Sequence, residues 1–134
     1  MKRPDRGYGM RHVALFVNDL GACEEFYTKL LGFEVEYRPN PQNVYLTTGG
    51  DNLALHQAVS SHQRDEAAQR LDHIGIFLKS PDDVDLWYRF LVDMRVPVRT
   101  EPKTNEDGTR SFHCYDPDGT VIQLMYHPPI DQWE

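Results

Sequence analysis

The sequence predicts an α+β fold in which two βαβββ modules form a curved, mostly antiparallel, eight-stranded cup. Two observations predict it. The segment HVALFVNDLGACEEFYTKLLGF, from residue 12, lines up with HIGIFLKSPDDVDLWYRFLVDM, from residue 73, and the same order of predicted elements follows each copy. At 134 residues the chain has the length of one domain, and each copy alone is too small to bury its own sheet. We therefore predict a single domain over residues 1–134, with internal modules at 10–59 and 71–127.

The first module is predicted to begin with a strand over residues 11–17, where β-branched and aromatic residues alternate with other types. A helix follows, with Asp19 as its N-cap and Gly32 as its C-terminal stop. Three further strands are predicted at 33–38, 44–48 and 53–58, with turns at 40–43 and 49–52.

A polar linker over residues 60–70 precedes the second module, which begins with a strand in DHIGIFLKS. Its helix starts with Ser80 as N-cap and Pro81 at the first helical position. Helical spacing predicts a buried stripe formed by Val84, Trp87, Leu91 and Met94. Strands are then predicted at 96–100, 109–115 and 120–126, with a loop at 103–108 and a DPDG turn at 116–119.

Histidines occupy equivalent positions in the first strand of each module. Residues two apart in a strand share a face, so His12 lies with Ala14 and Phe16, opposite an aliphatic face that suits a helix. We expect the histidine faces to line the concave side of the sheet. The same alternation brings further polar residues to such faces: His73, with Gly75 and Phe77; Ser111, with His113; Ala54, with His56; Gln123, with Val121 and Met125.

Imidazoles and a carboxamide gathered on one wall are typical of a metal site. A single inward histidine, however, is more often a hydrogen-bonded polar residue than a ligand. Local patterning alone leaves both interpretations open.

Composition excludes some classes of function. The net charge of −7 and the pI of about 5.3 argue against nucleic-acid binding, which needs a clustered basic face. No apolar run approaches the roughly 20 residues of a membrane span, and no signal peptide is expected. Cys23 and Cys114 fit no metal-binding spacing, so we expect reduced core thiols in a cytoplasmic protein. Trp133 is expected to cover a hydrophobic edge or a dimer surface.

Over about residues 10–127 the chain resembles the vicinal oxygen chelate superfamily, which includes glyoxalases, extradiol dioxygenases, fosfomycin-resistance enzymes and bleomycin-resistance proteins. The resemblance rests on HVALFVNDLGACEEFYTKLLGFEV, on DHIGIFLKS and above all on FHCYDPDGTVIQLM. It implies a glyoxalase-like fold, a small-molecule ligand and a homodimer, with the cavity built within one chain or from two chains.

The family's metal ligands correspond to His12, His73 and Gln123 in this sequence. A fourth ligand, present in some members, falls near Ala54 or His56. The departure is at Gln123, where the family has a glutamate. A glutamine can donate only a neutral carbonyl oxygen and cannot act as a base. The resemblance therefore implies a weak site for Zn²⁺, Ni²⁺, Fe²⁺ or Mn²⁺, a site completed by His56, or a metal-free pocket.

Other residues are candidates for substrate chemistry through the same resemblance. His56 lies near the position of a catalytic histidine of the dioxygenases. His113 and Ser111 fall on positions that contact substrate in some members, and His113 is also a candidate catalytic residue. Phe16 and Phe77 are expected to contact substrate from the histidine faces. The simpler alternative is that His56 and His113 belong only to the pocket wall.

Two functions follow as hypotheses. The first is a small divalent-metal-dependent enzyme, a lyase, isomerase or dioxygenase, acting on a substrate that chelates the metal through oxygen atoms. The alternative is a metal-free protein of the bleomycin-resistance type that binds or sequesters a small molecule. Metal content after purification from metal-replete medium distinguishes them.

Overall fold

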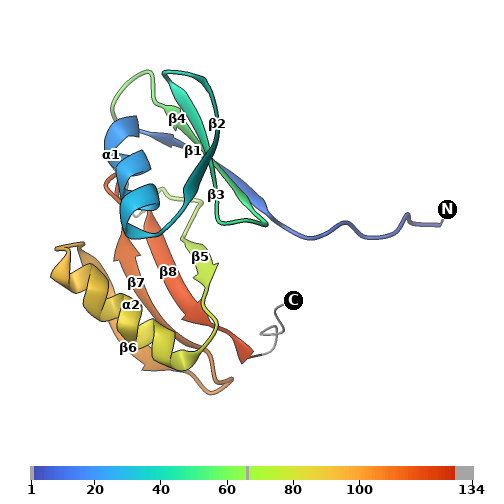
Figure 1. Ribbon diagram of the computed structural model, residues 1–134, viewed down its shortest axis with the longest axis vertical. Helices are drawn as coiled ribbons and strands as arrows, with labels where there is room; N and C mark the ends of the chain where they lie inside the picture. Colours follow the sequence, from blue (N-terminus) through green and yellow to red (C-terminus); the bar gives the residue numbers. More distant parts are fainter. Residues whose placement is uncertain (1, 66, 129–134) are drawn as a thin grey trace. The chain divides into compact units, whose positions relative to one another are not determined.

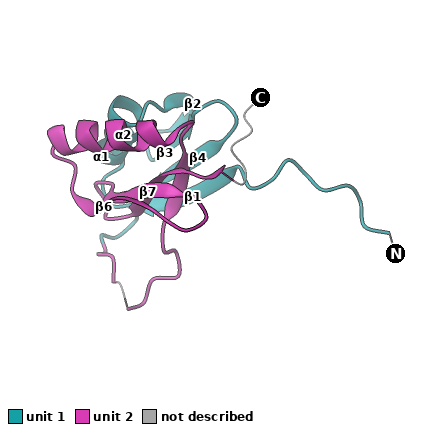
Figure 2. Cartoon of the chain, turned by 90° about the horizontal axis from the view of Figure 1, so that it is seen from below, with its two compact units in different colours: residues 1–61 teal, residues 62–134 magenta. Residues whose placement is uncertain are grey.

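The structure, a computed structural model, describes residues 2–65 and 67–128, so the expectation for Trp133 lies outside the described residues (Figure 1). The predicted βαβββ order occurs twice, which confirms the α+β fold class. By internal contacts the chain divides into two compact units, Met1–Ser61 and His62–Glu134 (Figure 2). The description of one domain with modules at 10–59 and 71–127 stays a prediction.

The first unit contains a four-stranded sheet in the order β1-β4-β3-β2. Strand β1 runs parallel to β4, and the other two pairings are antiparallel. The aliphatic face is the buried one, as expected: Val17, Val44, Leu46 and Leu55 are fully inaccessible to solvent. The strands are β1 (His12–Val17), β2 (Glu34–Asn40), β3 (Asn43–Thr47) and β4 (Asn52–Gln57).

Helix α1 (Leu20–Glu25) is held at its start by two side chains. The Asp19 carboxylate accepts the Ala22 N–H at 3.0 Å, which confirms the predicted N-cap. Gln57 on β4, which the sequence did not single out, accepts the Leu20 N–H at 3.0 Å and donates to the Asn18 carbonyl at 2.7 Å. These bonds tie the helix to the sheet.

The spacing predicted a regular helix up to Gly32, but the regular helix ends earlier. After α1 the chain forms a π-helical turn, η1 (Phe26–Leu30), closed by a hydrogen bond from the Leu31 N–H to the Phe26 carbonyl. Both Phe26 and its neighbour Tyr27 are buried at this turn. The helical segment ends at Gly32, whose φ of 80° belongs to the left-handed region that glycine adopts without strain.

The second unit repeats the arrangement, with strand order β5-β8-β7-β6. Helix α2 (Pro81–Asp93) packs on β6, β7 and β8, over a core that includes Phe112, Ile122 and Leu124. The predicted N-cap is confirmed, because the Ser80 hydroxyl accepts the Asp83 N–H at 3.2 Å. The strands are β5 (Ile74–Phe77), β6 (Val98–Thr104), β7 (Arg110–Tyr115) and β8 (Val121–Tyr126).

Two details of the second unit differ from the sequence prediction. Val84 and Leu91 of α2 are fully buried and Trp87 is half-buried, but Met94 is 50% exposed, so its place in the buried stripe was wrong. Met94 is the C-cap, one residue beyond the last residue of the helix. Strand β6 also extends to Thr104, into the segment predicted as a loop.

Both cysteines are core residues, as predicted, with no solvent exposure. Burial raises the pKa of the Cys114 thiol to about 12, and the nearby Asp116 carboxylate adds to this effect. Cys114 therefore stays a protonated thiol at neutral pH. Within the described residues, no helix is long and apolar enough to cross a membrane.

Candidate functional site

His12 occupies the open face of the first unit's sheet, as the alternation of β1 predicted. Its Nδ1 lies 2.7 Å from Asn52 Oδ1, and the Asn52 amide nitrogen donates to Glu36 Oε2 at 2.8 Å. Because the Asn52 amide presents its oxygen to the ring, His12 donates its Nδ1–H. The lone pair of a neutral His12 is then on Nε2. Metal-binding histidines are commonly oriented by a hydrogen bond of this kind.

His56 lies on the same face, farther along β4. Its Nδ1–H donates to Asn43 Oδ1 across the β3–β4 pair, and its ring lies 5.7 Å from that of Phe16. The Phe16 side chain is 66% exposed. Phe16 and His56 therefore form an accessible aromatic pair on the face that carries His12.

The strand pairing decides which residue of β4 corresponds to Gln123. In the second unit Gly75, two residues after His73, pairs with Gln123. In the first unit the residue two positions after His12 is Ala14, and it pairs with Ala54. Ala54 is thus the equivalent of Gln123, and it has no donor atom. Of the two positions near which a fourth ligand was expected, the register makes Ala54, and not His56, the counterpart of Gln123.

His73 precedes β5 and is oriented by its own neighbour in the chain. Its Nδ1 lies 2.6 Å from Asp72 Oδ2, so the ring donates to the carboxylate and a neutral His73 keeps its lone pair on Nε2. This hydrogen bond is the main cause of the lowered pKa of Asp72. His12 and His73 thus share one arrangement, in which a side-chain oxygen holds Nδ1.

His113 lies on β7, with its ring edge-on to that of His73 and the two centroids 5.5 Å apart. Its Nδ1 is 2.8 Å from the Thr100 hydroxyl, which also accepts the His113 backbone N–H at 2.9 Å. Partial burial lowers the pKa of His113, and the nearby His73 and Arg99 lower it further. His113 is therefore neutral at pH 7 and is held by two strands.

Gln123 lies on β8, directly opposite His113 in the strand register. Its Nε2 donates to the Ser111 hydroxyl at 3.1 Å. This bond fixes which end of the amide carries the nitrogen and which carries the carbonyl oxygen. Gly75, its neighbour on β5, has no side chain to cover this part of the face. A Cβ there would lie 3.3 Å from Met125 Sδ. The second unit therefore brings three of the predicted site residues, Ser111, His113 and Gln123, together.

The turn before β8 sets the position of Gln123. Asp116 is 4% exposed, and its Oδ1 accepts the N–H groups of Asp118 and Thr120 at 2.8 and 2.9 Å. Gly119 follows with a φ of 88°. These contacts explain why the DPDG motif is a reliable start for this strand.

Sequence reasoning missed the partners of the histidines. Asp72 could have been found as the acidic neighbour of His73, whereas Asn52 and Thr100 become visible only through the strand register. Phe77, a predicted substrate contact, lies 5.8 Å from the ring of His127. Among the described residues, no group of three His, Cys, Asp or Glu side chains is placed to hold a metal ion.

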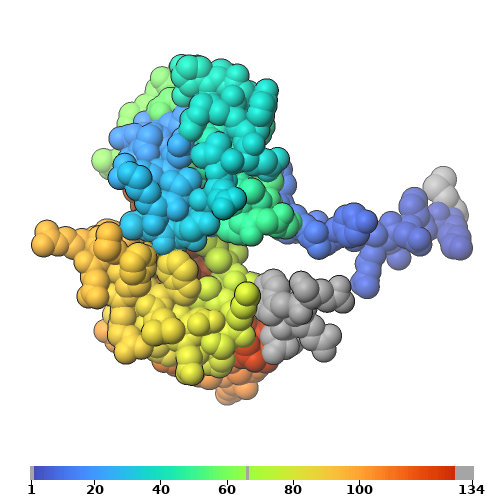
Figure 3. All heavy atoms as spheres, in the orientation of Figure 1, coloured from blue at the N-terminus to red at the C-terminus, as the bar shows by residue number. Residues whose placement is uncertain are grey.

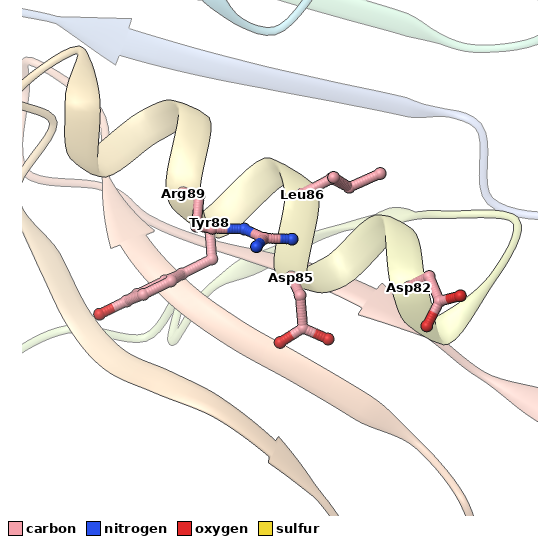
Figure 4. Close-up of a pocket in the computed structure, with 5 residues that line it drawn as sticks. All are labelled: Asp82, Asp85, Leu86, Tyr88 and Arg89. Carbon is pink, nitrogen blue, oxygen red and sulfur yellow. The ribbon is translucent and has the colours of Figure 1, made fainter.

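A pocket of about 590 Å³ lies elsewhere, on the surface of α2 (Figure 4). It contains none of the predicted site residues, and its side chains point in different directions from the helix. We assign it no role in the histidine site. Its lining consists of Asp82, Asp85, Leu86, Tyr88 and Arg89.

Two βαβββ units, with a histidine at the start of β1, another just before β5 and a DPDG turn before β8, define a class of protein. The chain belongs to the Glyoxalase/Bleomycin resistance protein/Dioxygenase superfamily, whose family model matches residues 9–124. A comparison with curated protein sequences gives no match.

Solved structures share the fold at low sequence identity. A glyoxalase/dioxygenase from Nostoc punctiforme is 22% identical, with a TM-score of 0.79 over 96% of this chain and 97% of its own. Lactoylglutathione lyase from Agrobacterium tumefaciens is 22% identical, with a TM-score of 0.74 over 91% and 96% of the two chains. The fosfomycin resistance protein FosX from Listeria monocytogenes is 20% identical, with a TM-score of 0.72 over 90% and 94%.

Proposed function

We propose that the protein is a divalent-metal-dependent enzyme of this superfamily, a lyase, isomerase or dioxygenase that acts on a small substrate with two neighbouring oxygen atoms. The observation that carries the proposal is the shared arrangement of His12 and His73. In each, a side-chain oxygen lies within 2.7 Å of Nδ1 and accepts its N–H, so that Nε2 can donate its lone pair to a metal ion. Orientation by a second residue is what a metal-binding imidazole requires.

The proposed ligands are His12, His73 and the carbonyl oxygen of Gln123. Neutral imidazoles with an oxygen donor suit Zn²⁺, Ni²⁺, Fe²⁺ or Mn²⁺. When bound, such an ion polarises an oxygen atom of the substrate as a Lewis acid. Because none of these ligands carries a negative charge, we expect weaker binding than with the glutamate that the family usually has.

The protein's own side chains would orient the substrate. Ser111 and His113 offer a hydroxyl and an imidazole beside Gln123, and Phe16 and Phe77 offer aromatic surface. Gln123 cannot accept a proton as a glutamate would, so any proton transfer falls to a histidine, with His56 and His113 as candidates. A small-molecule ligand also accords with the similarity of the fold to a lactoylglutathione lyase and a fosfomycin resistance protein. We further propose that the protein is a cytoplasmic homodimer.

The test is metal binding by the whole chain. The protein, freed of metal by a chelator, is titrated with Zn²⁺ and Ni²⁺ by calorimetry, alongside His12→Ala, His73→Ala and the double variant. We expect the double variant to lose binding and each single variant to bind more weakly. His62→Ala, an exposed histidine of the linker, is the matched control. Binding that survives the double substitution would show that these histidines are not the ligands.

A metal-free binding protein is the second candidate, and one observation favours it. Phe16 is 66% and Tyr37 60% exposed, and Tyr37 contacts Tyr45 with ring centroids 6.1 Å apart. The strand register places these aromatic rings on the face that carries His12. A protein that uses this face alone would bind an aromatic ligand equally well with and without a chelator, and this outcome would favour sequestration over catalysis.

A further inference from the structure

We infer that His113 is a metal ligand that joins His73 and Gln123, so that the second unit alone carries three donors for one divalent ion. This inference rests on the proposed metal-dependent function and adds a ligand to it. With its Nε2 bound to the ion, His113 would no longer be free to transfer a proton, which leaves His56 as the candidate for that role. It follows from three features of the face formed by β5, β8 and β7.

The first feature is the spacing of the two imidazoles. With metal–nitrogen bonds of about 2.1 Å, two rings that share a tetrahedral ion have centroids roughly 5–5.5 Å apart. The centroids of His73 and His113 are 5.5 Å apart, and the rings are nearly perpendicular, at 88°. The pair is therefore already spaced for a shared ion.

The second feature is the way in which each ring is held. Asp72 Oδ2 accepts the Nδ1–H of His73 at 2.6 Å, and the Thr100 hydroxyl lies 2.8 Å from Nδ1 of His113. The Thr100 oxygen has two lone pairs, so it can accept both the His113 backbone N–H and the ring N–H. In both histidines Nε2 then remains the atom that can bind a metal.

The third feature is the position of Gln123. His113 and Gln123 are directly opposite each other in the antiparallel β7–β8 pair, where Cβ atoms lie about 5 Å apart. The Ser111 hydroxyl accepts a hydrogen bond from the amide nitrogen of Gln123, so the carbonyl oxygen is the atom that can bind a metal ion. The imidazole of His113 also offsets part of what the site loses by having a neutral glutamine in place of a carboxylate.

Charged groups near the pair act in opposite directions. The Asp72 carboxylate attracts a cation, and the Arg99 guanidinium repels one. Their effects on the affinity for a cation partly cancel, so the inference is based on the donor atoms and their geometry.

The alternative is that His113 only supports the sheet through Thr100 and packs against His73. Zn²⁺ titrations of the whole chain, stripped of metal beforehand, separate the two roles. The variants are His73→Phe, His113→Phe and, as a matched control, His62→Phe in the exposed linker. Phenylalanine keeps the aromatic contact and removes only the nitrogen donors.

We expect His113→Phe to weaken Zn²⁺ binding at least tenfold, or about 1.4 kcal/mol, and His62→Phe to leave it unchanged. If wild type binds Zn²⁺ and His113→Phe binds it equally well, His113 is not a ligand, although the proposed function stands. If wild type binds neither Zn²⁺ nor Ni²⁺, the proposed function fails together with this inference.

A second measurement covers the case in which His113→Phe does not fold. Long-range ¹H–¹⁵N spectra of the wild-type histidines report which ring nitrogen binds the ion. We expect Zn²⁺ to shift Nε2 of both His73 and His113 while each Nδ1 stays protonated. An unchanged His113 Nε2 at saturating Zn²⁺ would overturn the inference.

Discussion

At the scale of single residues, the charge at position 123 governs how strongly a cation is held. The Gln123 amide is fixed by Ser111 and lies opposite His113 and Gly75 in the register. An amide oxygen carries only a partial charge, whereas a carboxylate adds a full negative charge close to the ion. In a partly buried site this difference is worth more than it would be in water.

Gln123→Glu should therefore tighten Zn²⁺ or Ni²⁺ binding by roughly tenfold or more, which corresponds to about 1.4 kcal/mol. Glutamate has nearly the same shape and can accept a hydrogen bond from the Ser111 hydroxyl. Calorimetric titration of both proteins measures the effect. Gln42→Glu, in the exposed turn between β2 and β3, makes the same change in net charge away from the face. Equal affinities for wild type and Gln123→Glu would place the metal away from Gln123.

Parity along single strands was enough to predict that His12 and Gln123 lie opposite the aliphatic faces of their sheets. It could not choose between Ala54 and His56, because that choice depends on the pairing of β1 with β4, which are separated by more than thirty residues of chain. The contacts of His12 with Asn52 and of His113 with Thr100 depend on register in the same way. Alternation gives the face of a residue, but only strand pairing gives its neighbours.

At the scale of the elements, the turn before β8 is the part of the site that sequence predicted best. Asp116 and Gly119 have local roles, since a carboxylate accepts nearby N–H groups and glycine adopts a positive φ. The π-helical turn after α1 and the exposed Met94 were missed because both depend on packing beyond the helical period.

Gly119→Ala should lower the free energy of unfolding by about 1–2 kcal/mol, because a Cβ is strained at a φ of 88°. The new methyl group would meet nothing closer than Arg64 Cβ at 3.8 Å, so the cost comes from the backbone and not from a clash. Gly50→Ala is the matched control, since Gly50 has no positive φ and no atom within 4 Å of the added Cβ. Urea unfolding of the three proteins gives the comparison. Equal stability of the two variants would mean that the turn tolerates a side chain at Gly119.

At the scale of the whole molecule, the fold class was predictable because the duplication repeats every local signal. The surface used for assembly was not predictable, because the exposure of an apolar side chain depends on what covers it. Helix α2, coloured yellow to orange in Figure 3, lies at the surface of its unit. Leu86 and Phe90 of α2 and its C-cap Met94, at intervals of four residues, are 55%, 41% and 50% exposed. Residues at this spacing form one stripe along a helix.

We expect this α2 stripe to be covered by a second copy of the chain, because an exposed apolar stripe is typical of an interaction surface and dimers are common in the superfamily. Light scattering at tens of micromolar should then give twice the chain mass of 15.6 kDa. Phe90→Glu should produce a monomer, because it would bury a charge at the centre of the contact. Val59→Glu makes the same kind of change at a side chain that is already fully exposed, and it should stay dimeric. A monomeric wild type would contradict the homodimer, and a dimeric Phe90→Glu would place the interface on another surface.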